Sequence, residues 1–257
     1  MGTSDLLQGQ PYDAILTLGD NQYESGKLAD FASFFAPSWG RSKSLLRPSE
    51  GNHEYGTAGA AGYFGYFGIA AGDPKKGYYS YDLGAWHIVA LNTNTPGTNT
   101  ADPSDCGVVS CKAGSAQEQW LKADLAAHPS VCTLVYWHHP RFSSGDHGNN
   151  PVSAAFWNDL YAANVDVVLN GHDHDYERLP PVDPAGNPDA ARGIREFVVG
   201  TGGVDFRGFH TPLATSQARN ITDFGVLKLT LHAASYDWEF IPEKGGTFTD
   251  RGTGTCH

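Results

Sequence analysis

The sequence predicts an α/β fold in which a mixed, largely parallel sheet is accompanied by a second, antiparallel sheet. Apolar runs of strand length alternate with helical patterns through the middle of the chain, as in parallel strands joined by helices. Strand-like runs without intervening helices follow in the last third. We expect a single domain over residues 1–257, because we find no internal repeat and no domain linker.

The strands are predicted from short apolar runs bounded by glycine, proline or polar residues. The second and third runs flank Gly84-Ala85, which predicts a hairpin, and the last three runs are expected to be antiparallel strands of the second sheet. In chain order the expected strands are residues 13–19, 78–83, 86–91, 131–137, 165–169, 196–199, 226–231 and 236–241.

Helices and loops are expected between these strands. The clearest helix start is Ser115 followed by Glu118, which is the pattern of a capping box. Segments rich in glycine, proline, threonine or aspartate are expected to be loops. The expected helices are residues 28–35, 115–127 and 152–163, the loops are 95–114 and 179–188, and residues 55–75 are a loop or an irregular helix.

Side chains suited to binding metal ions occur in four fragments, most of them at the end of a predicted strand. His172 and His174 follow strand 165–169 across a glycine, which allows a sharp turn and lets both rings face one pocket. The carboxyl ends of parallel strands converge on one crevice, so we expect the fragments to form one shared site. They are Gly19-Asp20-Asn21-Gln22-Tyr23, Gly51-Asn52-His53-Glu54, Val135-Tyr136-Trp137-His138 and Gly171-His172-Asp173-His174.

Each fragment alone has a simpler interpretation. Asp20 would be a turn or cap residue, and Tyr23 a packing residue. Asn52 in a glycine turn would ordinarily be a residue with left-handed backbone. The occurrence of all four fragments, rather than any one of them, favours a metal site.

Taken in order, the four fragments resemble the motifs of the calcineurin-like metallophosphoesterases, and most closely those of the purple acid phosphatase branch, which the tyrosine distinguishes. The resemblance implies a two-sheet αββα sandwich and hydrolysis of phosphate monoesters by a hydroxide generated at two metal ions. The family pattern begins with an earlier strand that ends in an aspartate ligand of the first metal. That block is missing here, so we expect the chain to be N-terminally truncated relative to the family or to do without this ligand.

The resemblance also implies the ligands of each metal. Asp20 is expected to bridge both ions, and Tyr23 and His174 to bind the first. A phenolate is a hard anionic donor suited to Fe(III), which favours iron there. The second ion, for which Zn, Mn and Fe(II) all fit, is expected to be held by Asn52, His138 and His172.

Two further histidines are expected to act on the substrate. His53 follows the ligand Asn52, and adjacent side chains usually diverge, so His53 is expected to touch the phosphate or to protonate the leaving group. His147 lies nine residues after His138, about where the resembling phosphatases carry a histidine that contacts the substrate. Two other functions remain open: phosphodiester hydrolysis at the same site, and a non-catalytic protein that binds a single metal.

Composition limits the partners and the compartment. The net charge of −11 argues against a nucleic-acid groove and against an anionic membrane surface, and no apolar run approaches the ~18 residues of a membrane helix. A small phosphate ester is therefore the expected partner, while the oligomeric state stays open. Four cysteines indicate a secreted or extracytoplasmic protein, with Cys106–Cys111 and Cys132–Cys256 as one possible pairing and a buried free Cys132 as the alternative.

Overall fold

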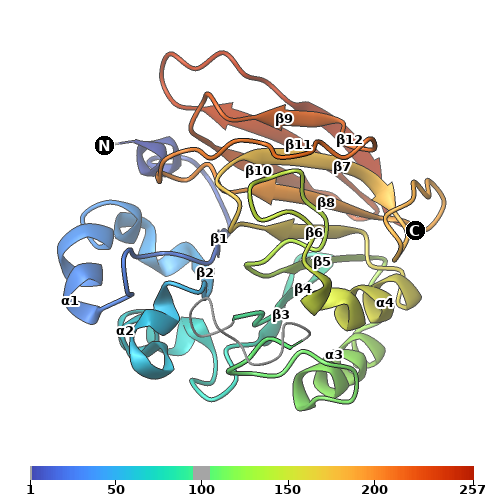
Figure 1. Cartoon of the computed structure of the whole chain (residues 1–257), viewed down its shortest axis with the longest axis horizontal. Helices are drawn as coiled ribbons and strands as arrows, with labels where there is room; N and C mark the ends of the chain where they lie inside the picture. Colours follow the sequence, from blue (N-terminus) through green and yellow to red (C-terminus); the bar gives the residue numbers. More distant parts are fainter. Residues whose placement is uncertain (1, 95–104) are drawn as a thin grey trace.

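The computed structural model describes residues 2–94 and 105–257, and its centre is a seven-stranded mixed sheet (Figure 1). The inner strands β4, β5, β6 and β8 run parallel, whereas β3, β7 and β9 are antiparallel to their neighbours. This confirms the predicted sheet and the predicted hairpin. In spatial order the strands are β3 (Tyr79–Leu83), β4 (Trp86–Ala90), β5 (Cys132–Tyr136), β6 (Val167–Asn170), β8 (Ile194–Val199), β7 (Tyr176–Val182) and β9 (Ala218–Asn220).

One face of this sheet is covered by α3 (Ala116–Ala127) and α4 (Ala154–Ala162), the latter preceded by the turn η7 (Pro151–Ser153). The Ser115 side chain accepts a hydrogen bond from the Glu118 amide at 3.2 Å, as a capping box requires. The Glu118 carboxylate accepts a hydrogen bond from the amide of Gly114, rather than from the amide of Ser115.

The other face carries a second layer. Successive residues of a strand point to opposite faces, so Val135 contacts the helices while Leu134 and Tyr136 face the second layer. Aromatic residues of β11 fill the space between the sheets, which confirms the predicted two-sheet sandwich. The layer consists of an antiparallel sheet, β10 (Gly225–Leu231), β11 (Ser235–Pro242) and β12 (Arg251–Thr255), and a parallel pair, β1 (Ile15–Leu18) and β2 (Leu46–Ser49).

Short helices surround the parallel pair and pack their aromatic residues together at one end of the molecule (Figure 1). Phe31, Phe35, Tyr63 and Phe67 form the centre of this group. The predicted helix at 28–35 and the irregular helix at 55–75 are both present. The helices are η1 (Thr3–Leu7), α1 (Leu28–Asp30), η2 (Phe31–Phe35), η3 (Trp39–Leu45), η4 (Glu54–Gly56), η5 (Ala58–Ala60), α2 (Ala61–Phe67) and η6 (Gly68–Ala71).

Two predictions about the strands were wrong. Residues 196–199 were assigned to the second sheet, but they belong to β8, which pairs with β6 in the large sheet. An apolar run indicates a strand without indicating its neighbour. Residues 179–188 were assigned to a loop, but the first four belong to β7, whose register shifts between Arg178 and Pro181. Prolines lack an amide donor, so they fit this strand at its irregularity.

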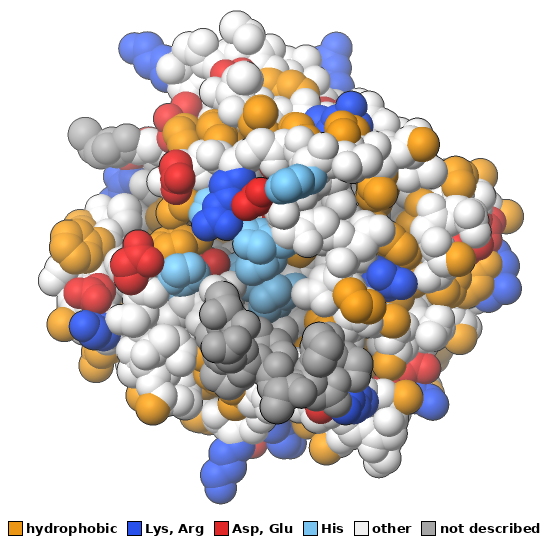
Figure 2. All heavy atoms as spheres, in the orientation of Figure 1, with side chains coloured by type: hydrophobic (Ala, Val, Ile, Leu, Met, Phe, Trp, Pro, Cys, Tyr) orange, Lys and Arg blue, Asp and Glu red, His pale blue; other side chains and the backbone are white. Residues whose placement is uncertain are grey.

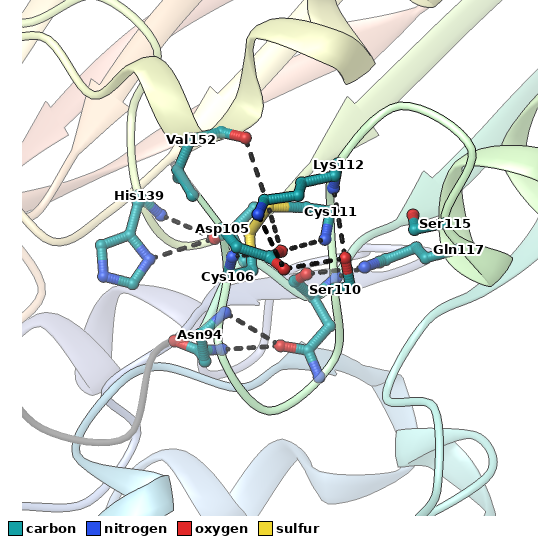
Figure 3. Close-up of a disulfide and its surroundings, with 12 residues drawn as sticks. Asn94, Asp105, Cys106, Ser110, Cys111, Lys112, Ser115, Gln117, His139 and Val152 are labelled. Carbon is teal, nitrogen blue, oxygen red and sulfur yellow. Dashed lines mark hydrogen bonds and ion pairs between the residues drawn. A yellow bond between two sulfur atoms is a disulfide. The ribbon is translucent and has the colours of Figure 1, made fainter. Parts of the chain in front are cut away.

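Both disulfides join the cysteines as the sequence analysis had paired them. Cys106 bonds Cys111 within one loop, where Asp105 accepts hydrogen bonds from both of their amides (Figure 3). Cys132 at the start of β5 bonds Cys256 after β12, so the alternative of a free Cys132 is wrong. Part of the predicted loop 95–114, residues 95–104, lies outside the described residues.

A cavity of about 830 Å³ separates β1 from β10. Among the described residues β1 pairs with β2 alone, and β10 pairs with β11 alone, so each leaves one edge without a partner strand. Apolar side chains of both strands line the cavity, including Leu16, Leu227 and Leu229. The cavity continues to the carboxyl end of β1, where the metal-ligand fragments lie.

No helix among the described residues is long and apolar enough to cross a membrane.

Candidate metal centre

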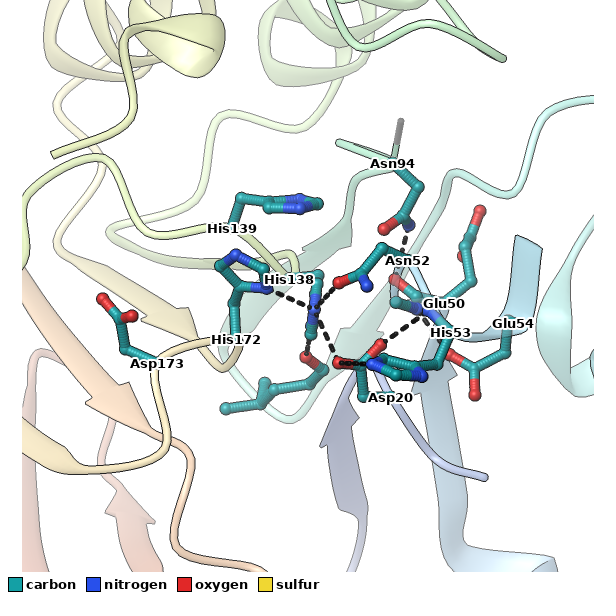
Figure 4. A network of polar contacts seen from close by, with 12 residues as sticks. Asp20, Glu50, Asn52, His53, Glu54, Asn94, His138, His139, His172 and Asp173 are labelled. Carbon is teal, nitrogen blue, oxygen red and sulfur yellow. Dashed lines mark hydrogen bonds and ion pairs between the residues drawn. The ribbon is translucent and has the colours of Figure 1, made fainter. Parts of the chain in front are cut away.

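The loops after β1, β2, β5 and β6 converge and bring the four fragments to one place (Figure 4). Figure 2 shows histidine side chains gathered in a hollow on this face, bordered by acidic and basic side chains. The convergence follows from the parallel direction of each strand pair. The expected ligands from four separate segments are therefore neighbours in space.

We call Asn52, His138 and His172 the second-metal group. Their polar atoms lie together around His138 Nε2. His138 Nε2 lies 3.0 Å from Asn52 Oδ1, 3.1 Å from His172 Nδ1 and 3.2 Å from Asp20 Oδ2. On the other side of the ring, His138 Nδ1 lies 2.8 Å from the Leu18 carbonyl, to which it donates. This hydrogen bond sets the tautomer in which Nε2 presents its lone pair to the pocket.

The donor set fits a cation. The Asn52 oxygen, the Asp20 carboxylate and the His138 Nε2 lone pair are all electron-pair donors, and such atoms converge where a metal binds. Burial alone would raise the pKa of Asp20, but His138 and His53 lower it below the usual range. Burial alone would lower the pKa of His138, but the Asp20 carboxylate raises it. Each of these two groups therefore favours the charged form of the other.

The residues Tyr23 and His174, here called the first-metal group, lie on the other side of Asp20. The Tyr23 hydroxyl is 3.3 Å from Asp20 Oδ2 and 3.4 Å from His174 Nε2. His174 Nδ1 donates to the Asp205 carbonyl at 2.9 Å, so Nε2 is again turned to the pocket. Burial and the Asp20 carboxylate raise the pKa of Tyr23 far above its usual range, so its phenolate form requires a strong cation beside it. Asp20 stands between the two groups, as expected of a bridge.

The backbone at the site has conformations that hold the loops close together. Asp20 and His172 have φ values of 48° and 67°, in the left-handed region. A Cβ atom at Gly51 would lie 2.0 Å from Asp20 Oδ1, so only glycine permits this approach. The buried Glu54 carboxylate accepts hydrogen bonds from the amides of Gly51 at 2.6 Å and Gln22 at 3.0 Å. These bonds connect the loop after β1 to the loop after β2. Burial and the Asp20 charge raise the pKa of Glu54 to about 7.

His53 lies beside the residues that are expected to be ligands and takes the place of none of them. Its Nδ1 is 2.6 Å from the Glu24 carbonyl, and its Nε2 is 4.0 Å from Asp20 Oδ2. The ring packs 4.3 Å from that of Tyr23, and a quarter of the side chain is exposed. His53 therefore points a nitrogen over the first-metal side of the pocket.

His147 lies on the opposite side, with its ring 4.0 Å from that of His172. The buried Asp173 carboxylate holds it, accepting from Nδ1 at 2.7 Å and from the backbone amide at 3.0 Å. His147 Nε2 lies 3.1 Å from Arg207 NH1. The sequence analysis assigned no role to Asp173, although it stands between His172 and His174, or to Arg207, for which no motif was available.

His139 is a further imidazole at the second-metal side. Its ring is 4.3 Å from that of His172, and His138, His139 and His172 together could hold an ion. Burial lowers the pKa of His139 to about 3, so its ring is neutral. Its Nδ1 is paired with the Thr93 hydroxyl at 3.1 Å.

Comparison with known families agrees with this geometry. The family model for calcineurin-like phosphoesterases matches residues 4–176, which is more than half of the chain. The chain belongs to the calcineurin-like phosphoesterase family. The match includes all four fragments of the metal centre, so the family resemblance noted from the sequence is confirmed.

The curated relatives include plant and fungal phosphatases. Purple acid phosphatase 21 of Arabidopsis thaliana is 29% identical over 210 residues, which cover 72% of this chain and 44% of the relative. Acid phosphatase A of Cryphonectria parasitica is 32% identical over 130 residues, covering 44% of this chain and 26% of the relative. The chain thus spans less than half the length of these relatives.

Solved structures share the fold. Purple acid phosphatase PPD1 from yellow lupin seeds superposes with a TM-score of 0.78 at 19% identity, covering 95% of this chain and 47% of that one. The Plasmodium protein described as GAP50, the anchor in the inner membrane complex, gives a TM-score of 0.70 at 14% identity, covering 99% and 82%. Identities this low establish the fold alone.

Proposed function

We propose that this protein hydrolyses phosphate monoesters at a centre of two metal ions, in the manner of an acid phosphatase. The observation that carries the proposal is the position of Asp20, whose Oδ2 lies 3.2 Å from His138 Nε2 and 3.3 Å from the Tyr23 hydroxyl. One carboxylate between two sets of donors is the arrangement that a bridged pair of cations needs. Relatives named as acid and purple acid phosphatases support the same reaction class.

Each ligand group would hold one ion. Tyr23 and His174 with Asp20 would bind Fe(III), while Asn52, His138 and His172 with Asp20 would bind Zn, Mn or Fe(II). Two ions held there would supply Lewis acidity for the phosphoryl oxygens and would lower the pKa of a bound water. The chain itself supplies the fixed tautomers of His138 and His174, whose Nδ1 atoms donate to carbonyl oxygens.

The two histidines that are not expected to be ligands would act on the leaving group of the substrate. His53 Nε2 faces the first-metal side, where it is placed to donate a proton to a departing alkoxide. His147 faces the second-metal side and is the second candidate acid, but its Nε2 accepts from Arg207, so it would have to exchange that hydrogen bond for a proton before it could act. Asp173 would keep the His147 ring in position through the hydrogen bond to Nδ1. The substrate would be a small phosphate ester rather than nucleic acid, because the chain carries a net charge of −11.

The two disulfides support a secreted or extracytoplasmic location, since such bonds persist in oxidising compartments.

A non-catalytic protein with a single metal is the second candidate. One observation favours it: the first-metal group offers only Tyr23 and His174 beyond the shared Asp20, among the described residues.

Hydrolysis by the purified protein tests the choice. The protein, loaded with iron and zinc, is assayed against p-nitrophenyl phosphate and bis(p-nitrophenyl) phosphate, with His138→Ala and a chelated sample beside it. We expect turnover of the monoester that is abolished by the substitution and by chelation. A metal-loaded protein without turnover of either ester would favour the non-catalytic candidate, and preference for the diester would make it a phosphodiesterase.

A further inference from the structure

The loop that joins β8 to β9 folds onto the metal centre and brings a cation to it. The Asp205 carbonyl accepts from His174 Nδ1 at 2.9 Å, and the amide of Arg207 donates to the His174 carbonyl at 3.2 Å. Further along, the amide of His210 donates to the Ser144 carbonyl at 3.1 Å. These bonds fasten the loop to both the His174 segment and the His147 segment, so Arg207 has a defined position between them.

The guanidinium of Arg207 contacts the imidazole ring of His147. Its NH1 lies 3.1 Å from His147 Nε2, whose other nitrogen is held by Asp173. The His147 ring lies 4.0 Å from that of His172, so the guanidinium is close to the second-metal group.

The ion pair that Arg207 makes is a weak one. Asp146 Oδ2 is 3.7 Å from Arg207 NH1, and both side chains are about 40% exposed. The other oxygen of Asp146 lies 3.1 Å from His210 Nε2, so the carboxylate is shared. Exposed pairs of this kind contribute little, and a guanidinium has five N–H donors arranged as a fork. Arg207 can therefore turn to an anion at small cost.

We propose that Arg207 binds the phosphoryl group of the substrate and selects monoesters over diesters. This inference rests on the proposed function. A monoester presents three non-bridging oxygens and up to two negative charges, whereas a diester presents two such oxygens and one charge. A guanidinium forms charge-assisted, often bidentate hydrogen bonds with phosphate oxygens, so the additional oxygen and charge of the monoester favour it.

The test measures phosphate binding and hydrolysis in parallel. The metal-loaded protein is titrated with inorganic phosphate by calorimetry, and kcat/KM is measured for p-nitrophenyl phosphate and bis(p-nitrophenyl) phosphate. The variants are Arg207→Gln, Arg207→Lys and Asp146→Asn, with Arg251→Gln on β12 as the control arginine. Metal content is measured for every sample.

We expect Arg207→Gln to weaken phosphate binding and monoester kcat/KM by about 10- to 100-fold, the range for loss of one charge-assisted hydrogen bond. Diester kcat/KM should change by less than about threefold. Arg207→Lys should fall between, because it keeps the charge and loses the fork. Asp146→Asn should bind phosphate at least as tightly as the unmodified protein, and Arg251→Gln should match it.

Equal losses for both esters, or unchanged phosphate binding with Arg207→Gln, would overturn the proposal. The two hypotheses fail separately. If the unmodified protein hydrolyses neither ester, the proposed function is wrong, and the calorimetric comparison still decides whether Arg207 binds phosphate.

Discussion

The two halves of the candidate metal centre differ in how firmly the fold holds their residues. In the second-metal group three donors lie within 3.2 Å of His138 Nε2, and the His138 side chain is almost fully buried. In the first-metal group the contacts of the Tyr23 hydroxyl are 3.3 and 3.4 Å. The difference originates below the site. His138 and His172 follow β5 and β6, which are inner strands of the large sheet, whereas Tyr23 follows β1, which lies beside the cavity.

Similar ligand side chains can therefore be ordered to different degrees by the strands that carry them. Ligands on packed inner strands are already near their binding positions, so less ordering is needed when a metal binds. Ligands beside an open strand edge need more ordering when a metal binds. We therefore expect the second-metal group to retain its ion more tightly than the first-metal group.

The largest expected effect comes from removing a ligand of the tighter half. Changing Asn52, His138 or His172 to Ala should lower occupancy of the second metal and nearly abolish turnover. The thermal midpoint should change little, because the strands beneath remain packed. Metal analysis, kinetics and thermal unfolding of each variant check this, with His232→Ala on the far β10–β11 turn as control. Normal metal content and affinity in His172→Ala would refute the assignment.

The next-largest effect tests whether His53, rather than His147, protonates the leaving group. His53→Gln should slow alkyl phosphates by about 10²- to 10⁴-fold and activated aryl phosphates much less, because an aryl oxide departs without protonation. Metal content should stay unchanged, since His53 is not a ligand. A uniform loss across leaving groups would make His53 a phosphate-positioning residue and transfer the acid role to His147.

A smaller effect is expected from filling the cavity between β1 and β10. A version with an added upstream strand that ends in aspartate should bind the first metal at least about tenfold more tightly. The reason is that it adds a ligand to Asp20, Tyr23 and His174 and covers the strand edges. The control carries asparagine in place of that aspartate. Equal metal affinity and equal activity with and without the strand would show that the open edge has no functional cost.

The smallest expected change is in the absorption spectrum, and it concerns the first-metal group alone. A protein with iron bound by the Tyr23 phenolate should be coloured, and Tyr23→Phe should remove the visible charge-transfer band while leaving the second metal in place. Absorption spectra with parallel metal analysis check this. A colourless protein with stoichiometric ferric iron, or an unchanged spectrum in Tyr23→Phe, would show that the phenol is not a ligand.

The structure brings together the residues that the sequence analysis proposed as ligands, and each of these fragments is short enough to be recognised on its own. His172 and His174 are two residues apart, and Asp20 and Tyr23 three, so spacing and residue type were sufficient. Arg207 was not predicted, because it reaches His147 from 60 residues away and lies in no motif.

The errors in the fold have a similar origin. An apolar run such as 196–199 does not encode which strand it pairs with, and the β12 segment Arg-Gly-Thr-Gly-Thr has no apolar pattern. Its glycines are explained only in the structure, where a Cβ at Gly252 would lie 2.4 Å from the Trp238 ring.

Metal analysis of the purified protein during stepwise chelation decides whether the centre holds two ions of unequal affinity. Two ions per chain are expected at the outset. The ion of the first-metal group should leave first, and its departure should remove the visible band while the second ion remains. A protein that never holds more than one ion, or that loses both together, would contradict a two-metal centre with unequal halves.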